Sequence, residues 1–184
     1  MQIEDLVFVT SNPNKVREAE AVLGRALDHR ALDLPEIQSL DLLEVVRAKA
    51  AAAWQEIGRP VLVEDTGLEL AGLNGFPGPL VRWLLTSVGP GGIGRIAHSF
   101  DDRNATARCL LCAFDGASEV VGEGVVEGCI AAEPRGPGGF GWDSVFIPDE
   151  PGGRTYGEMS DDEKNGISHR RRAFEALREA LTAV

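Results

Sequence analysis

The sequence predicts one α/β domain in which helices flank a central mixed β-sheet. The chain has 184 residues, close to the size of one domain, roughly 150 residues, and we expect residues 1–184 to form it without a linker or a repeat. Short apolar runs alternate with helical patterns in the amino-terminal half, which is typical of strands connected by helices. Two longer runs follow, joined by Asp115-Gly116, a dipeptide suited to a hairpin turn.

The first elements follow from changes in the hydrophobic period. Residues 6–10 are an apolar run rich in Val and Phe, so we expect a strand, and the SNPNK turn leads from it into a helix with apolar positions at Val16, Ala19 and Val22. The next expected elements are a strand over 29–34, a helix over 42–57, a short buried strand over 61–63 that ends in Glu64 and Asp65, and helices over 80–88 and 93–100.

The carboxy-terminal half begins with the predicted hairpin. Residues 105–114 and 119–130 form its strands, and residues 143–147 form one more strand. Ser160 and Glu163 have the spacing of a capping box, in which hydroxyl and carboxylate satisfy each other's backbone amides. Residues 168–181 have the amphipathic pattern of a terminal helix.

The charge balance excludes several classes of partner. The chain has 29 acidic side chains and 18 Lys plus Arg, a net charge of −11. Each neutralised phosphate of a polyanion needs a nearby cation, so we expect no nucleic-acid binding over a broad surface and no binding to membranes through a basic face. Any anion that this protein handles must be small and met locally, by a few cations or by a bound metal ion.

The cysteines and the amino terminus predict a reduced, cytoplasmic protein. Cys109 and Cys112 form a C-x-x-C pair within a strand-like run, but no second pair completes a metal site, so we interpret them and Cys129 as structural thiols. The terminus begins acidic, without the basic region of a signal peptide. No later run reaches the roughly 18 apolar residues that a membrane span needs.

A loop after the first strand is the first candidate binding segment. It comprises Thr10, Ser11, Asn12, Pro13, Asn14 and Lys15. A loop that leads into a helix presents backbone amides and the positive end of the helix dipole, and Lys15 lies in the first helical turn, so the segment can hold phosphate. An ordinary helix N-cap is the alternative interpretation.

Carboxylates at the end of the 61–63 strand are the second candidate. A carboxylate there needs an open cleft or a matching cation, and the strand ends of α/β sheets often face ligand crevices. Mg²⁺ bound to a nucleotide phosphate needs one or two protein carboxylates. Glu64 and Asp65 could supply them with Glu36 from the preceding loop, or could serve only as turn and cap residues.

The glycine-rich stretch 136–143 is the third candidate. Its glycines let the backbone approach a flat ligand, Phe140 and Trp142 offer faces for stacking, and Asp143 can accept from ring N–H groups. The alternative is a tight loop whose aromatic side chains fold back onto the core.

A cationic cluster at residues 164–172 is the fourth candidate. His169 and Arg170 fall in the first turn of the terminal helix, where cations oppose the helix dipole. Their placement costs stability unless an anion compensates, so the conflict predicts a site.

Together these segments resemble one family, the Ham1-type noncanonical purine nucleotide pyrophosphatases, and within it the inosine triphosphate pyrophosphatases. The resemblance covers residues 6–181. It is carried by the loop at 10–15, Leu34-Pro35-Glu36, the segment 63–67, Pro77-Gly78-Pro79, Pro134-Arg135-Gly136, the segment 139–143 and the segment 158–170. The resemblance implies a nucleotide cleft between two lobes, Mg²⁺ as cofactor and a homodimer.

The resemblance also implies roles for individual residues. The loop at 10–15 holds the triphosphate, Glu36 and Asp65 bind Mg²⁺, and Asp65 matches the proton acceptor for the attacking water. The implied substrate contacts outside the loop are Lys49, Thr66, Arg82, Phe140, Gly141, Trp142, Asp143, Lys164, His169 and Arg170. Ser11 replaces a commoner Gly, which is tolerable if its φ stays negative, and Ser144 replaces a common Pro.

The implied reaction is attack of water on the α-phosphorus of ITP, dITP or XTP, releasing the monophosphate and pyrophosphate. The sequence leaves open which carboxylate binds metal and which activates water, and Glu64 stays a candidate. Three alternatives stay open as well: a broader or Maf-like nucleoside triphosphate pyrophosphatase, a nucleotide sensor without turnover, and a single-stranded RNA-binding module, against which the net charge argues.

Overall fold

The computed structural model describes residues 1–150 and 152–183. Over these residues, seven strands form one mixed sheet in the order β2-β1-β3-β5-β6-β7, with β4 paired to β3. The strands are β1 (Val7–Val9), β2 (His29–Arg30), β3 (Val61–Leu70), β4 (Pro77–Gly78), β5 (Asn104–Phe114), β6 (Glu119–Ile130) and β7 (Phe146–Pro148). The first three pair in parallel, and the remaining pairs are antiparallel.

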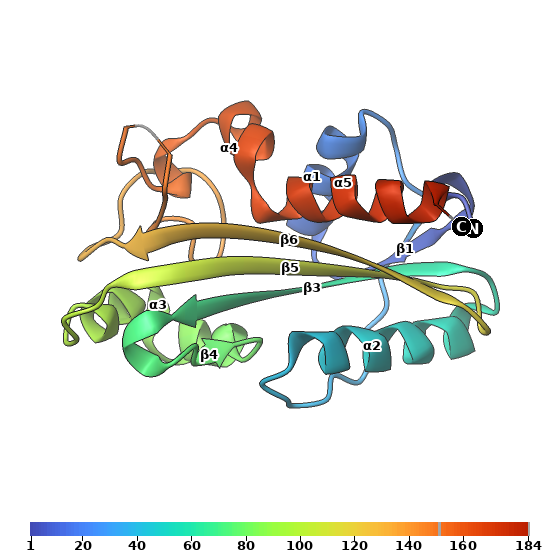
Figure 1. Cartoon of the computed structure of the whole chain (residues 1–184), viewed down its shortest axis with the longest axis horizontal. Coiled ribbons are helices and arrows are strands. Elements are labelled where there is room, and N and C mark those ends of the chain that lie inside the picture. The colour runs from blue at the N-terminus through green and yellow to red at the C-terminus, as the bar shows by residue number, and fades with distance from the viewer. Residues whose placement is uncertain (151, 184) are drawn as a thin grey trace.

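Helices cover both faces of the sheet, which confirms the predicted fold class (Figure 1). The α-helices are α1 (Pro13–Leu23), α2 (Leu42–Ile57), α3 (Val81–Ala97), α4 (Asp161–Ile167) and α5 (His169–Thr182). Short 3-10 helices occupy Ile3–Asp5, Ala71–Leu73 and Tyr156–Glu158. Helices α1, α4 and α5 lie above the sheet in Figure 1, and α2 lies below it. Helix α3 packs at the other end of the strands, against a cluster that includes Leu68 and Val126. Within the described residues, no helix combines the length and apolarity that crossing a membrane requires.

The predicted hairpin and the predicted caps are confirmed. The two strands of the hairpin pair with each other, starting next to the turn with Phe114 opposite Glu119. Gly116 in the turn has a φ of 95°. Both halves of the capping box between Ser160 and Glu163 are present, so α4 begins where expected. The α2 helix has the predicted bounds.

The prediction that the third strand ends at its carboxylates is wrong. β3 continues to Leu70, because Glu64 and Asp65 stay in the ladder opposite Leu111 and Leu110 of β5. A strand alternates its side chains between the two faces of the sheet. The two carboxylates therefore point to opposite faces instead of marking one end together.

Other boundaries differ from the prediction for local reasons. The second strand shortens to two residues, because β1 offers a ladder of only three. The two helices predicted over 80–88 and 93–100 are one segment with a break at Gly89 (φ 67°, ψ 175°), and the second part starts early because Pro90 suits a first helical turn. Asp143 and Val145 lie in a turn ahead of β7, and the short β4 was not expected.

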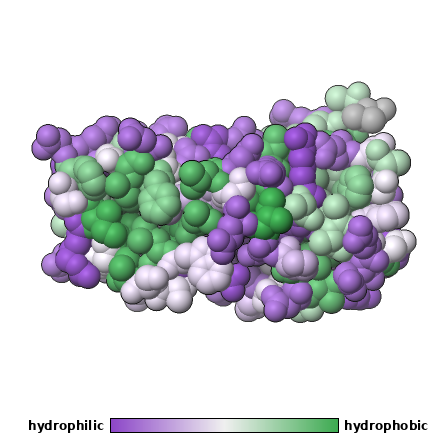
Figure 2. Space-filling model, turned by 90° about the horizontal axis from the view of Figure 1, so that it is seen from below, coloured by the Kyte–Doolittle hydropathy of each residue, from purple (hydrophilic) through white to green (hydrophobic). Residues whose placement is uncertain are grey.

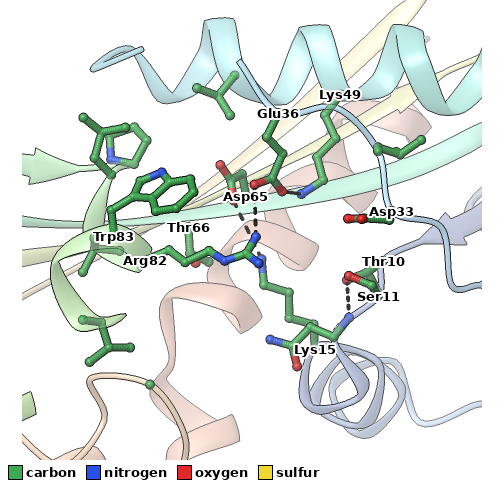
Figure 3. A pocket seen from close by; sticks show the side chains of 18 of the residues that line it. Thr10, Ser11, Lys15, Asp33, Glu36, Lys49, Asp65, Thr66, Arg82 and Trp83 are labelled. Carbon is green, nitrogen blue, oxygen red and sulfur yellow. Dashed lines mark hydrogen bonds and ion pairs between the residues drawn. The ribbon is translucent and has the colours of Figure 1, made fainter. Parts of the chain in front are cut away.

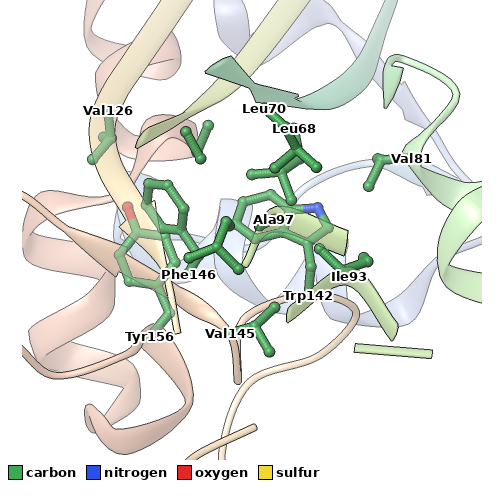
Figure 4. Close-up of a cluster of buried hydrophobic side chains, with 13 residues drawn as sticks. Leu68, Leu70, Val81, Ile93, Ala97, Val126, Trp142, Val145, Phe146 and Tyr156 are labelled. Carbon is green, nitrogen blue, oxygen red and sulfur yellow. The ribbon is translucent and has the colours of Figure 1, made fainter. Parts of the chain in front are cut away.

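Three apolar clusters form the core. One lies above the sheet around Phe8, Phe174 and Leu177, and a second lies below it around Val46 and Val63. The third continues on the same face as the first, at the other end of β3, β5 and β6, where rings of Trp142, Phe146 and Tyr156 pack together (Figure 4). Cys109 and Cys112 are buried in the first and second clusters, on opposite faces, which confirms them as structural thiols.

A glycine pair in β6 allows α5 to lie directly on the sheet. A Cβ atom at Gly124 would overlap the backbone of His169 and Ala173, and one at Gly122 would overlap the backbone of α5 further along. The close approach brings the first turn of α5 near enough for the side chain of Arg170 to reach Glu64 of β3.

We predict that Gly124→Ala lowers the free energy of unfolding by about 3 kcal/mol, since overpacking of a core contact costs that much. Gly166→Ala is the matched control. Gly166 lies in α4, and the position that a Cβ atom would take there has nothing within 4 Å of it, so alanine should stabilise by about 0.5–1 kcal/mol. Urea denaturation measures both. Equal stability of the two variants would contradict the close contact between β6 and α5.

Candidate active site

A cleft opens where β3 changes partners along one edge. β1 pairs with β3 at Val61 and Leu62, and β4 pairs with it at Leu68 and Glu69. In the described part of the chain, the stretch between these pairings has no strand on that edge. The cleft there has a volume of about 480 Å³, and both Asp65 and Thr66 line it.

The loop at 10–15 forms one end of the cleft. Asn12 caps α1 by accepting from the amide of Asn14 at 3.0 Å, and the hydroxyl of Thr10 accepts from the amide of Asn12 at 3.2 Å. Among the described residues, Asn74 is the non-glycine residue with a positive φ. Ser11 therefore occupies the usual glycine position without backbone strain. Lys15 lies in the first turn of α1, as predicted.

Charged side chains from four segments converge around Asp65 (Figure 3). The Nζ atom of Lys49 on α2 donates to Glu36 at 2.8 Å, and Arg82 on α3 donates to the other oxygen of Glu36 at 3.4 Å. The Nζ atom of Lys15 lies 3.9 Å from Asp65. Three cations and two carboxylates thus meet around Asp65, in a cleft that Asp33 also lines, in a protein whose net charge is −11.

Two of the cleft carboxylates, Asp65 and Glu36, differ in their electrostatic environment. Burial raises the pKa of Asp65 above its ordinary value, although Lys15 and Lys49 oppose that shift. Burial acts in the same direction at Glu36, but the hydrogen bond and charge of Lys49, helped by Arg82, hold the pKa of Glu36 below its ordinary value. Asp65 is therefore the carboxylate here that accepts a proton more readily.

Glu64 faces away from the cleft. Its oxygens accept from Arg170 on α5, from Nε at 2.8 Å and from Nη2 at 2.7 Å. Lys15 lies 3.3 Å from one of these oxygens. Burial would raise the pKa of Glu64, but the charges of Arg170 and Lys15 outweigh it and lower the pKa to about 2.

Most of the predicted site residues line the cleft. Those that do are Thr10, Ser11, Asn12, Pro13, Lys15, Glu36, Lys49, Asp65, Thr66, Arg82, Phe140, Gly141 and Trp142. The remaining five, Asn14, Asp143, Lys164, His169 and Arg170, lie outside its lining. Four of the five, all except Asn14, are buried behind the wall that Phe140 and Trp142 form.

The cationic cluster of residues 164–172 is compensated within the protein. Arg170 donates to Glu64 and to Glu18, and the Nζ atom of Lys164 donates to Glu18 at 2.7 Å and to Asp143 at 2.6 Å. The expectation that an external anion must balance the first turn of α5 is therefore wrong. Carboxylates from α1, β3 and the 136–143 loop supply the balance.

His169 is held neutral beside these charges. Burial, with the nearby positive charges of Arg170 and Lys164, lowers the pKa of His169 well below its ordinary value. Its ring stacks on Tyr156 and lies 5.3 Å from Trp142. In the described part of the chain, its Nδ1 atom is buried without a hydrogen-bond partner.

The two predicted stacking rings have different environments. Trp142 is 7% exposed and packs on Phe146, so it forms a wall of the cleft and not an open stacking face. Phe140 is half-buried, and the Nζ atom of Lys164 lies 4.9 Å from its ring centre. Asp143 accepts from the amide of Phe140 at 2.7 Å, which fixes this loop.

Sequence reasoning missed several lining residues. Trp83 is 58% exposed at the edge of the cleft (Figure 3), and Ile37, Gln38, Asp33 and Leu85 also line it. Trp83 directly follows Arg82, a predicted substrate contact, and this adjacency in the sequence was the one signal that could have identified it. The others lie in an irregular loop or on a helix face that no motif marks.

The arrangement suits a small polyphosphate that brings its own metal ion. In the described residues, no three His, Cys, Asp or Glu side chains gather closely enough to hold a metal by themselves. Mg²⁺ that is bound to phosphate and water needs only one or two protein carboxylates, and Glu36 and Asp65 are carboxylates of this cleft. Lys15, Lys49 and Arg82 are the cations that line it.

Comparison with known proteins provides an independent line of evidence. The chain matches the Ham1 family over residues 6–180. It is 48% identical over 177 residues to inosine triphosphate pyrophosphatase 2 of Trypanosoma cruzi, covering 94% of this chain and 90% of the relative. It is 39% identical over 193 residues to inosine triphosphate pyrophosphatase of Saccharomyces cerevisiae, covering 98% of each.

Solved structures share the fold. A HAM1 protein from Coxiella burnetii superposes with a TM-score of 0.78 at 30% identity, covering 97% of this chain and 100% of that chain. A nucleoside-triphosphatase named as a dITP/XTP pyrophosphatase, from Mycobacterium abscessus, superposes with a TM-score of 0.69 at 29% identity, covering 93% and 97%.

The lowered pKa of Glu64 predicts how stability depends on pH. A carboxyl group whose pKa falls from its ordinary 4.5 to about 2 on folding stabilises the folded state fully above pH 4.5, and that stabilisation is lost as pH falls towards 2. We expect the free energy of unfolding to fall over this interval, and to fall less steeply in Glu64→Gln. Urea denaturation at several pH values measures both slopes, and identical slopes would contradict the assignment.

Proposed function

This chain belongs to the Ham1 family, and from that premise we propose that it hydrolyses the noncanonical purine nucleoside triphosphates ITP, dITP and XTP. The products are the nucleoside monophosphate and pyrophosphate, so the enzyme removes these nucleotides from the cellular pool. The convergence of Lys15, Lys49 and Arg82 on Asp65 and Glu36 carries the proposal. A triphosphate with a divalent cation matches that charge pattern in a protein that is otherwise strongly acidic.

Glu36 and Asp65 are proposed to hold Mg²⁺. Both side chains line the cleft, and their carboxylate oxygens are ligands of the kind that Mg²⁺ prefers. In this structure Lys49 and Arg82 both donate hydrogen bonds to Glu36. When Glu36 binds the metal ion instead, these two cations become available to bind the phosphates. When bound, Mg²⁺ neutralises the phosphate charge that develops during hydrolysis.

Asp65 is proposed to orient or deprotonate the attacking water. Water attacks the α-phosphorus, the bond to the bridging oxygen breaks, and pyrophosphate leaves. A carboxylate that ligates metal is a poor base, so the two roles proposed for Asp65 compete. Of the two carboxylates Asp65 is the better proton acceptor, because its pKa is raised and that of Glu36 is lowered. Glu64 is not assigned this role, because its carboxylate is committed to Arg170.

Discrimination is proposed to occur at the end of the cleft near Phe140. Behind that ring lie Lys164 and Arg170, both donors, and His169 with an unpartnered Nδ1 among the described residues. A purine with a 6-oxo group presents an acceptor to such donors, whereas adenine presents a 6-amino donor. An unmet buried partner costs about 1–3 kcal/mol, which sets the scale of the preference per contact.

We also propose a cytoplasmic homodimer that binds no nucleic acid. The net charge of −11 supports the absence of nucleic-acid binding.

Exposed apolar side chains support the homodimer. Figure 2 shows hydrophobic side chains gathered on the face seen from below, and the exposed fractions of Leu40 and Trp83 are 66% and 58%. A mass of one chain by light scattering would contradict the dimer.

We expect the protein to release pyrophosphate from ITP, dITP and XTP in the presence of Mg²⁺, and to act poorly on ATP and GTP. Incubation with each nucleotide and identification of the phosphate product test this directly, with omission of Mg²⁺ as the metal control. Release of orthophosphate, or equal use of ATP, would favour a broader or Maf-like activity instead.

Asp65→Asn should lower kcat by about 10³-fold, within the range ascribed to general acid–base catalysis, while the fold is retained. Asp33→Asn removes a carboxylate from the same cleft and serves as the control, with an expected loss of less than about tenfold. Steady-state kinetics with ITP and circular dichroism measure the two effects. Retained turnover in Asp65→Asn would remove this residue from the mechanism.

A further inference from the structure

Six buried charged side chains form a continuous chain of contacts from one end of the cleft to the other. In spatial order they are Lys15, Glu64, Arg170, Glu18, Lys164 and Asp143. Cations and carboxylates alternate, three of each, so the set is neutral. Asp143 ends it by accepting from the amide of Phe140. We call this set the charge ladder.

The charge ladder is almost completely removed from solvent. The side chain of Lys15, at the cleft, is 11% exposed, and that of Glu64 is 0% exposed. The other four side chains are at most 6% exposed. A buried ion pair is weak evidence for stability, because apolar residues of similar volume often stabilise as well or better. Six charges in this place therefore call for a functional explanation.

Glu64 is the member that belongs to both halves of the site. One of its oxygens lies 2.7 Å from Nη2 of Arg170 and 3.3 Å from Nζ of Lys15. The other oxygen accepts from Nε of Arg170 at 2.8 Å. Lys15 lies at the phosphate end of the cleft, and Arg170 lies behind Phe140 at the other end.

We propose that Glu64 is a positioning residue that holds Lys15 and Arg170 with one carboxylate, and so couples phosphate binding to recognition of the purine. Glu64 contacts no substrate itself. A fork of two parallel hydrogen bonds fixes the plane of the Arg170 guanidinium, and that fixed carboxylate in turn fixes Lys15. The inference rests on the proposed function for the identity of the purine, but the contacts of Glu64 with the two cations do not depend on it.

The position of Glu64 on β3 explains why it can do this. Strand alternation sends Glu64 upward to α1 and α5, while its neighbour Asp65 faces the cleft. Gly124 lets α5 come close enough for Arg170 to reach the strand. A shift of Arg170, which is proposed to recognise the base, therefore displaces the ammonium group of Lys15 at the phosphate end of the cleft.

The test removes the negative charge of Glu64 and keeps the shape of its side chain. Glu64→Gln leaves one acceptor oxygen but removes the charge that Lys15 and Arg170 share. Glu69→Gln is the matched control, since Glu69 is on the same strand and accepts from Arg108 at 2.8 Å outside the cleft. Calorimetry with inorganic tripolyphosphate probes the phosphate end, and binding of inosine monophosphate against adenosine monophosphate probes the purine end. Neither measurement requires turnover.

We expect Glu64→Gln to weaken tripolyphosphate binding about tenfold, a factor that corresponds to 1.4 kcal/mol, and to reduce the preference for inosine monophosphate by a similar factor. Glu69→Gln should change neither. A variant that only loses thermal stability, with both affinities unchanged below its melting temperature, overturns the proposal. A change at one end alone also overturns it, because the carboxylate would then not be shared.

A second variant keeps the proposal testable if Glu64→Gln fails to fold. Arg170→Lys keeps the positive charge but loses the fork, so Glu64 is no longer fixed. Although Arg170 does not line the cleft, this variant should also weaken tripolyphosphate binding about tenfold. Unchanged tripolyphosphate affinity overturns the coupling. If the wild-type protein fails to release pyrophosphate from ITP, the proposed function fails, while the tripolyphosphate result still decides the role of Glu64.

Discussion

The ion pair between Arg170 and Glu64 joins the terminal helix to the central strand of the sheet. Its two hydrogen bonds lie at 2.7 and 2.8 Å within a fully buried environment. Breaking a pair of this kind leaves an uncompensated buried charge, which is strongly destabilising. The positions of α1, α4 and the 136–143 loop depend on it, because Glu18, Lys164 and Asp143 continue the same chain of contacts.

The sheet topology determines where the cleft can form. β3 pairs with a parallel strand at its start and with the antiparallel β4 near its end, so its edge is open between them. The alternation of side chains then separates two adjacent carboxylates. Asp65 reaches the cleft, and Glu64 reaches the interior, where it holds the cations of the charge ladder.

The distribution of charge connects the fold to the chemistry. The excess of acidic residues keeps the surface unsuited to long polyanions. Lys15, Lys49 and Arg82 concentrate positive charge in one cleft, while three further carboxylates neutralise the buried cations behind it. The cleft thus places three cations beside the three carboxylates Asp33, Glu36 and Asp65, a pattern that suits a short polyphosphate with a divalent cation. The charge ladder is neutral only as a whole, with Lys15 included.

Much of this molecule follows from local patterns in the sequence. The α2 helix, the hairpin at Asp115-Gly116 and the capping box at Ser160 depend on neighbouring residues, so periodicity and turn chemistry identify them. Much of the cleft-lining part of the predicted site falls in short motifs such as the loop at 10–15, whereas Lys49 and Arg82 lie in none of them and were predicted only through the family resemblance.

Only the tertiary structure decided what the charged residues contact. The sequence placed Arg170 at a helix start that lacked an anion, and it left Glu64 beside the favoured Asp65 as a remaining candidate. The partners of Arg170 lie 106 and 152 positions away in the chain, and no local pattern records such a distance. The sequence by itself determined the elements and the chemical types available to the site, because these depend on neighbours. The pairing of charges depends on how β3, α1 and α5 come together in space.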